Sequence, residues 1–83
     1  MKIIGTLSGW ASDGKQYSVD VVHVRKRNFA VYIQGEGVVQ AYWNKAPMIE
    51  LAERIANSEK LIDEALSELR DSNRMFGPPT ILY

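Results

Sequence analysis

The first half of the chain alternates apolar and polar residues with a period of two, as half-buried β-strands do. The alternation is clearest over residues 16–26, where one side carries Tyr17, Val19, Val21 and His23 and the other carries Ser18, Asp20, Val22 and Val24. Residues 2–11, 29–34 and 38–43 have the β-branched and aromatic content of further strands. Asp13-Gly14 is a two-residue hairpin signal, and the other connections are also short. We therefore predict a four-stranded antiparallel meander.

The apolar period lengthens to about 3.6 residues in the second half, which indicates a helix with one buried face. The positions that form this apolar stripe are Met48, Leu51, Ala52, Ile55, Ile62, Ala65, Leu66 and Leu69. Pro47 suits a first helical turn, where its missing N–H would have no intrahelical partner. We predict one nearly continuous helix over about 47–72. The alternative is two helices, with Ser58 capping the second.

A sheet and a helix must each bury an apolar side, so the pattern predicts an α+β domain in which the helix stripe packs on one sheet face. Eighty-three residues leave room for one core, and we predict a single domain over residues 1–83. The C-terminal tail is apolar, and residues 80–83 are expected to dock on the domain or to pair with a sheet edge.

The residues that support catalysis or metal binding are scarce in this chain. It has no cysteine and one histidine, whereas metal sites need three or four convergent ligands. No phosphate-binding glycine loop or nucleophile elbow is present, so we expect neither an enzyme nor a cofactor. The sequence shows no signal segment and no long apolar run, which favours a cytoplasmic protein without membrane contact.

Charge is balanced overall but unevenly distributed. Residues 1–45 carry six basic and three acidic side chains, and residues 46–83 carry four basic and seven acidic ones. This asymmetry predicts two surfaces of opposite potential, which bear on association rather than on fold.

The candidate binding residues are basic groups before the third predicted strand and aromatic groups on its outer side: Arg25, Lys26, Arg27, Tyr32 and Tyr42. Cationic and aromatic side chains together are typical of single-stranded nucleic-acid binding. The same residue types dominate protein–protein hot spots. Acidic residues of the predicted helix, Glu64 and Glu68 among them, offer a further surface for a basic partner.

In size, lack of cysteine and meander-plus-helix layout, the chain resembles small inhibitor proteins encoded by phages, anti-CRISPR proteins among them. The resemblance implies a protein that blocks a host defence complex by occupying a nucleic-acid or partner site. Our prediction is a non-enzymatic protein–protein interaction module, either monomeric or homodimeric. A single-stranded nucleic-acid-binding domain is the alternative.

Overall fold

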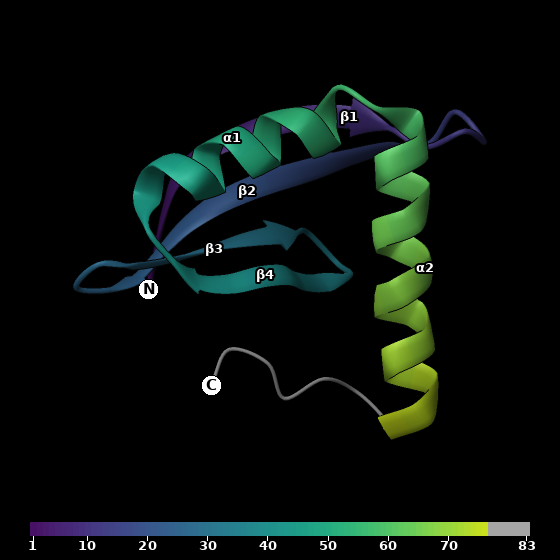
Figure 1. The fold of residues 1–83 in the computed structure, drawn as a ribbon. Helices are drawn as coiled ribbons and strands as arrows, with labels where there is room; N and C mark the ends of the chain where they lie inside the picture. The colour runs from purple at the N-terminus through teal and green to yellow at the C-terminus, as the bar shows by residue number, and fades with distance from the viewer. Residues whose placement is uncertain (77–83) are drawn as a thin grey trace.

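Four strands and two helices follow one another along the protein, whose computed structural model describes residues 1–76 apart from the side chains of Tyr42 and of residues 72–76. The strands are β1 (Lys2–Trp10), β2 (Gln16–Arg25), β3 (Asn28–Ile33) and β4 (Gly37–Trp43), and the helices are α1 (Lys45–Ala56) and α2 (Glu59–Phe76). The strands form one antiparallel sheet in the order β1-β2-β3-β4 (Figure 1), which confirms the predicted meander. The tail predicted over 80–83 lies outside the described residues.

The connection between β1 and β2 is a three-residue loop, residues 12–14, closed by the pairing of Ala11 with Lys15. It replaces the two-residue turn predicted at Asp13-Gly14. The backbone N–H of Ala11 donates to the carbonyl oxygen of Lys15 at 3.0 Å, and that of Gly14 donates to the carbonyl oxygen of Ala11 at 2.9 Å. Gly14 has a φ of 88°, a left-handed conformation that glycine adopts without strain. The arrangement is that of a type I turn followed by a glycine bulge.

The prediction of one nearly continuous helix over 47–72 is wrong, because α1 ends at Ala56, α2 begins at Glu59, and the chain bends between the two helices (Figure 1). The side-chain amide of Asn57 donates to the carbonyl oxygen of Glu53 at 2.8 Å. The hydroxyl of Ser58 accepts the N–H of Leu61 at 3.2 Å, which makes Ser58 the N-cap of α2. Both polar side chains bind backbone groups and thereby favour a helix end and a new start over continuation.

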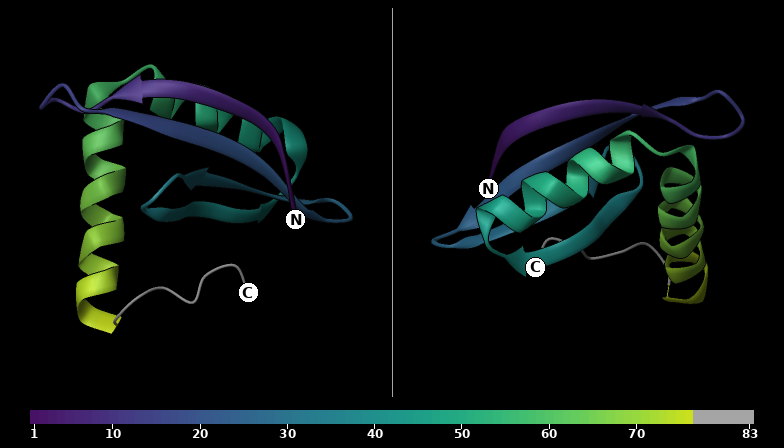
Figure 2. Two further views of the ribbon diagram at one scale, coloured as in Figure 1. Left: turned by 180° about the vertical axis from the view of Figure 1, so that it is seen from behind. Right: turned by 45° about the horizontal axis from the view of Figure 1, so that its top comes forward.

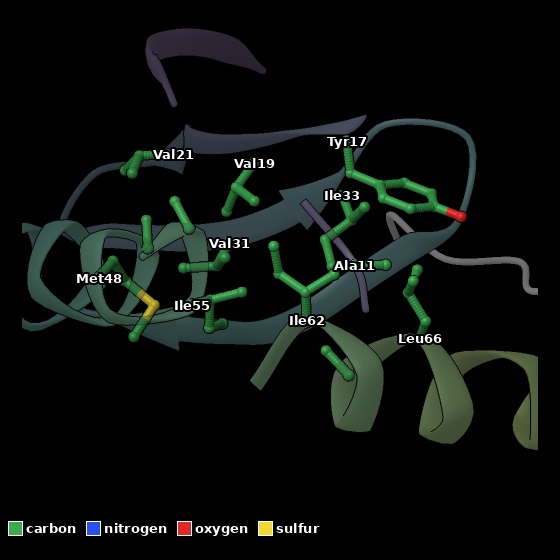
Figure 3. Packing of buried hydrophobic residues seen from close by; sticks show 13 residues of the cluster. Ala11, Tyr17, Val19, Val21, Val31, Ile33, Met48, Ile55, Ile62 and Leu66 are labelled. Carbon is green, nitrogen blue, oxygen red and sulfur yellow. The ribbon is translucent and has the colours of Figure 1, made fainter. Parts of the chain in front are cut away.

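One face of the sheet packs against both helices and forms the core (Figure 3). Val19, Val21, Val31 and Ile33 project from the sheet, as the alternation predicts. The predicted helix stripe meets them with six buried residues, Met48, Ala52, Ile55, Ile62, Ala65 and Leu66. Each large aliphatic side chain buried in this way contributes about 1.5–3 kcal/mol relative to exposure. Burial of these side chains therefore holds the helices on the sheet.

The bend between the helices packs closely against Gly9 of β1, which has no side chain. A Cβ atom added at Gly9 would overlap Cδ1 of Ile62 and would lie 2.8 Å from the carbonyl oxygen of Ala56. Only glycine allows so close an approach, so this residue sets where α2 leaves the sheet.

Polar contacts hold α2 at the end of the sheet that carries the β1–β2 and β3–β4 loops. The N–H of Ser12 donates to Oδ1 of Asp63 at 3.1 Å, and hydrogen bonds from Ser12 lower the pKa of Asp63. Nε of Arg70 donates to Oε1 of Glu36 at 3.1 Å, and its NH2 group donates to the hydroxyl of Tyr17 at 3.1 Å. The contact with Glu36 is the larger cause of the raised pKa of Arg70.

Candidate functional site

The structure separates the predicted binding residues into groups at opposite ends of the sheet (Figure 1). The turn with Arg25, Lys26 and Arg27 lies at one end, and α2 with the exposed Glu64 and Glu68 stands at the other. The predicted charge asymmetry therefore runs from end to end of the sheet. A single ligand that contacts both groups would have to span the sheet.

Side chains of the adjoining strands β2 and β3 hold the basic turn in place. Lys26 has a φ of 47°, in the left-handed region, and its carbonyl oxygen accepts a hydrogen bond from Nε2 of His23 at 2.7 Å. The half-buried His23 ring stacks on Phe29, with a centroid distance of 4.6 Å and an interplanar angle of 17°. These contacts fix the backbone of the turn and leave its cationic side chains in solvent.

Two further lysines lie at the same end of the sheet (Figure 2). Lys2 pairs with His23 across the β1–β2 ladder, and Lys45 begins α1. We refer to the exposed basic residues gathered here as the basic end: Lys2, Arg25, Lys26, Arg27 and Lys45.

Tyr32 projects from the outer face of the sheet, as predicted, and is half-buried there. Its partner on β4 is Val38, because the tight turn after Ile33 sets the register of the hairpin. Tyr42 lies four residues beyond Val38, so it is not the cross-strand partner of Tyr32. The side chain of Tyr42 lies outside the described part of the structure.

The outer face carries an apolar hollow of about 250 Å³ next to the basic end. Its walls come from all four strands of the sheet, and the apolar residues among them are Ile3, Val22, Ala30, Tyr32 and Val38. Met1 and Lys2 complete the lining, and the side chains of Met1 and Ile3 are 67% and 54% exposed. The sequence pointed to Tyr32 but not to Met1 or Ile3, because periodicity does not show which strand lies at an edge.

Asp20 lies on the same outer face and has no exposed surface. Its Oδ2 atom accepts a hydrogen bond from Nε2 of Gln34 at 3.0 Å, and its Oδ1 atom has no partner in the described part of the chain. Asp20 pairs with Tyr32 across the ladder and precedes Val22 by two residues, so it adjoins the wall of the hollow. The alternation placed Asp20 on the correct face but gave no sign of its burial.

Two tryptophans are exposed at different ends of the sheet. Trp43, 54% exposed, pairs with Phe29 at the basic end. Trp10, 49% exposed, closes β1 at the end near α2, away from Tyr32. Trp10 and Tyr32 therefore lie apart and do not form a shared aromatic cluster on the outer face.

The described residues hold no group of three or more histidine or carboxylate side chains that could bind a metal. No helix among them is long and apolar enough to cross a membrane. The fold defines a small α+β domain with an antiparallel sheet and two helices over one face. Comparisons with protein-family models, with curated proteins and with solved structures gave no match.

Proposed function

We propose that the protein is a binding module for an acidic protein segment, which places an apolar side chain in the outer-face hollow. The observation that carries this proposal is the position of the hollow next to the basic end. The hollow gives an apolar anchor a place to be buried, with Ile3 and Met1 at its mouth. The adjoining lysines and arginines supply complementary charge for carboxylates.

The narrower role implied by the resemblance to phage inhibitors fits within this proposal. In that role the outer face would occupy a site on a host defence complex and thereby exclude its normal ligand. Within the described part of the chain, one buried oxygen of Asp20 has no hydrogen-bond partner, which supports a binding role for this face, since such an oxygen costs about 1–3 kcal/mol and calls for an explanation.

Single-stranded nucleic-acid binding is the second candidate. The exposed Trp43 next to the basic turn favours it, because an aromatic face beside cationic groups suits a stacked base and a phosphate. The zero net charge and the partial burial of Tyr32 favour the protein segment instead.

The test is selection of short peptides from a random library on the immobilised protein, followed by affinity measurement. Enriched peptides should combine acidic residues with one aliphatic or aromatic residue. Ile3→Ser should weaken their binding by about tenfold or more, as loss of a hot-spot contact does. Neutralising the turn with Arg25→Gln, Lys26→Asn and Arg27→Gln should weaken it further, with asparagine chosen because it tolerates the left-handed conformation.

The matched control is the pair Glu64→Lys and Glu68→Lys on α2, which should leave peptide binding unchanged. Peptides without an acidic and apolar pattern, or binding insensitive to Ile3→Ser, would contradict the proposal. Fluorescence anisotropy with labelled single-stranded RNA and DNA addresses the second candidate. Binding that falls steeply with salt and is lost in the neutralised turn would favour nucleic acid.

A further inference from the structure

The outer edge of β1 is long, and no strand of the described residues pairs with it. The pairing of β1 with β2 shifts register between Ile3 and Gly5, and the strand is regular from Gly5 to Trp10. β1 lies at one edge of the sheet, with α1 running beside it in the same direction (Figure 2). Its nine residues include no proline and no charge after Lys2, although edge strands usually carry such residues to prevent pairing with other chains. Ile3, Ile4 and Trp10 on this strand are all large, apolar and exposed. An edge of this kind is suited to the addition of another strand.

One face of α1 borders the same edge and carries a basic, an apolar and an acidic residue in that order. Lys45, Ile49 and Glu53 follow one another at intervals of four residues, so they lie on one helix face. With Ile4, Gly5 and Leu7 of β1, these three residues line a groove of about 390 Å³ between the strand and the helix. Neither Lys45 nor Glu53 forms an ion pair within the described part of the chain. The stripe therefore reads basic, apolar, acidic along the edge.

We infer that a second copy of this chain occupies the β1 edge, antiparallel to the first about a two-fold axis. An antiparallel copy sets Lys45 of one chain beside Glu53 of the other, twice by symmetry, with the two Ile49 side chains between them. Lys45 and Glu53 lie four residues before and after Ile49 and carry opposite charges. When a second copy is turned by the two-fold axis, each charge therefore faces its opposite. An isologous interface requires this self-complementarity.

The exposed apolar residues of β1 and the charges at the two ends of the sheet also favour the antiparallel arrangement. Ile3 and Trp10 both lie on the outer face, as their pairing with Val22 and Gln16 shows. Antiparallel pairing brings Ile3 of one copy to Trp10 of the other, which covers exposed apolar surface at both ends of β1. It also brings the basic end of each copy next to the acidic α2 of its partner. The zero net charge adds no general repulsion between copies.

Charge reversal tests the pairing by sedimentation velocity over a range of protein concentrations. The natural chain should dimerise with a dissociation constant below about 1 mM. Lys45→Glu or Glu53→Lys alone turns both symmetric contacts into like-charge contacts and should weaken the dimer by about tenfold. The double variant should regain the natural affinity. An equimolar mixture of the two single variants should associate more strongly than either alone, because the mixed dimer restores both opposite-charge contacts.

The matched controls are Glu50→Lys and Arg54→Glu, an exposed pair with the same spacing on α1 that does not line the groove. They change the net charge equally, and neither they nor their mixture should reproduce the loss and rescue. A monomer at every concentration would overturn the inference. A dimer in which the mixture shows no rescue would overturn it too.

Cross-linking tests the strand pairing separately, and the absence of natural cysteine makes it specific. A mixture of Ile3→Cys and Trp10→Cys chains should give a mixed disulfide dimer, because antiparallel strands bring positions 3 and 10 together. Two copies of position 3 would lie about 23 Å apart, too far for a disulfide. Trp43→Cys on the opposite edge is the control. Homodimers of Ile3→Cys without mixed dimers would indicate parallel pairing and refute the proposed symmetry.

This inference goes beyond the proposed function and can fail independently of it. Glu53 neither lines the outer-face hollow nor belongs to the basic end, so Glu53→Lys, which weakens the dimer, should still bind selected peptides. Peptide binding without dimers would refute the inference alone, and dimers without peptide binding would refute the proposed function alone.

Discussion

Replacing Gly9 by alanine should loosen the bend between the helices. The added Cβ would overlap Ile62 Cδ1, which can move, and would lie 2.8 Å from the carbonyl oxygen of Ala56, which belongs to the backbone. Overpacking of this kind costs about 1–3 kcal/mol. The lower entropy of the unfolded alanine chain offsets about 0.4–1 kcal/mol of this. We expect a net loss of about 1–2 kcal/mol in the free energy of unfolding.

The assay is urea unfolding followed by circular dichroism at one fixed, low protein concentration, together with a thermal scan. A loss of 1 kcal/mol should lower Tm by about 4–8 °C in a domain of this size. Gly5→Ala is the matched control on the same strand, because a Cβ there meets no atom within 4 Å. Adding Ile62→Val to Gly9→Ala should restore part of the loss, since it removes one of the two close contacts. Equal stability of the Gly9 and Gly5 variants would refute the reasoning.

Three further predictions concern single contacts. Ser58→Ala removes the cap of α2 and should lower the free energy of unfolding by about 1 kcal/mol in urea titrations, and an unchanged midpoint would contradict the capping role. The pKa of Asp63 is held below its ordinary value of 3.8, so its contact with Ser12 contributes above that pH and is lost as pH falls through the lower, folded pKa. Hydrogen exchange of the Ser12 amide should accelerate there beyond its intrinsic pH dependence, and an equal acceleration in Asp63→Asn would contradict this. Asp20→Val removes a buried oxygen that has no hydrogen-bond partner among the described residues and frees the exposed Gln34 to bind water, so urea titrations should show equal or greater stability. A loss above about 2 kcal/mol would show that the carboxylate is fully satisfied.

The sheet and the core could be predicted because they depend on local periodicity. The alternation over 16–26 sorts residues between the faces, and the helix stripe identifies the positions that meet them. One nearly continuous helix was predicted because its apolar stripe continues past Asn57 with little change. The break comes from side-chain bonds to the backbone, which a hydrophobic pattern does not record. Ser58 is a recognisable N-cap residue, but the sequence does not show whether its capping bond outweighs the tendency of the surrounding residues to continue one helix.

The candidate site was less predictable because it depends on where elements lie relative to one another. Whether Ile3 is buried or exposed is decided by the position of β1 at a sheet edge. The close approach at Gly9 sends α2 to the far end of the sheet, and this separates Glu64 from the basic turn. Asp20 looks like any polar residue in an alternating strand. Its burial follows from tertiary packing.

The end-to-end charge asymmetry links the two proposed interactions in physical terms. An acidic segment at the basic end and the acidic α2 of a second copy would be drawn by the same lysines and arginines. The hollow and the β1 edge also share Ile3, and Lys45 belongs to both the basic end and the edge, whereas Glu53 belongs to the edge alone. Where two ligands compete for one charged surface, each lowers the apparent affinity of the other by mass action. A partner that binds the outer face tightly should therefore shift the protein from dimer to monomer.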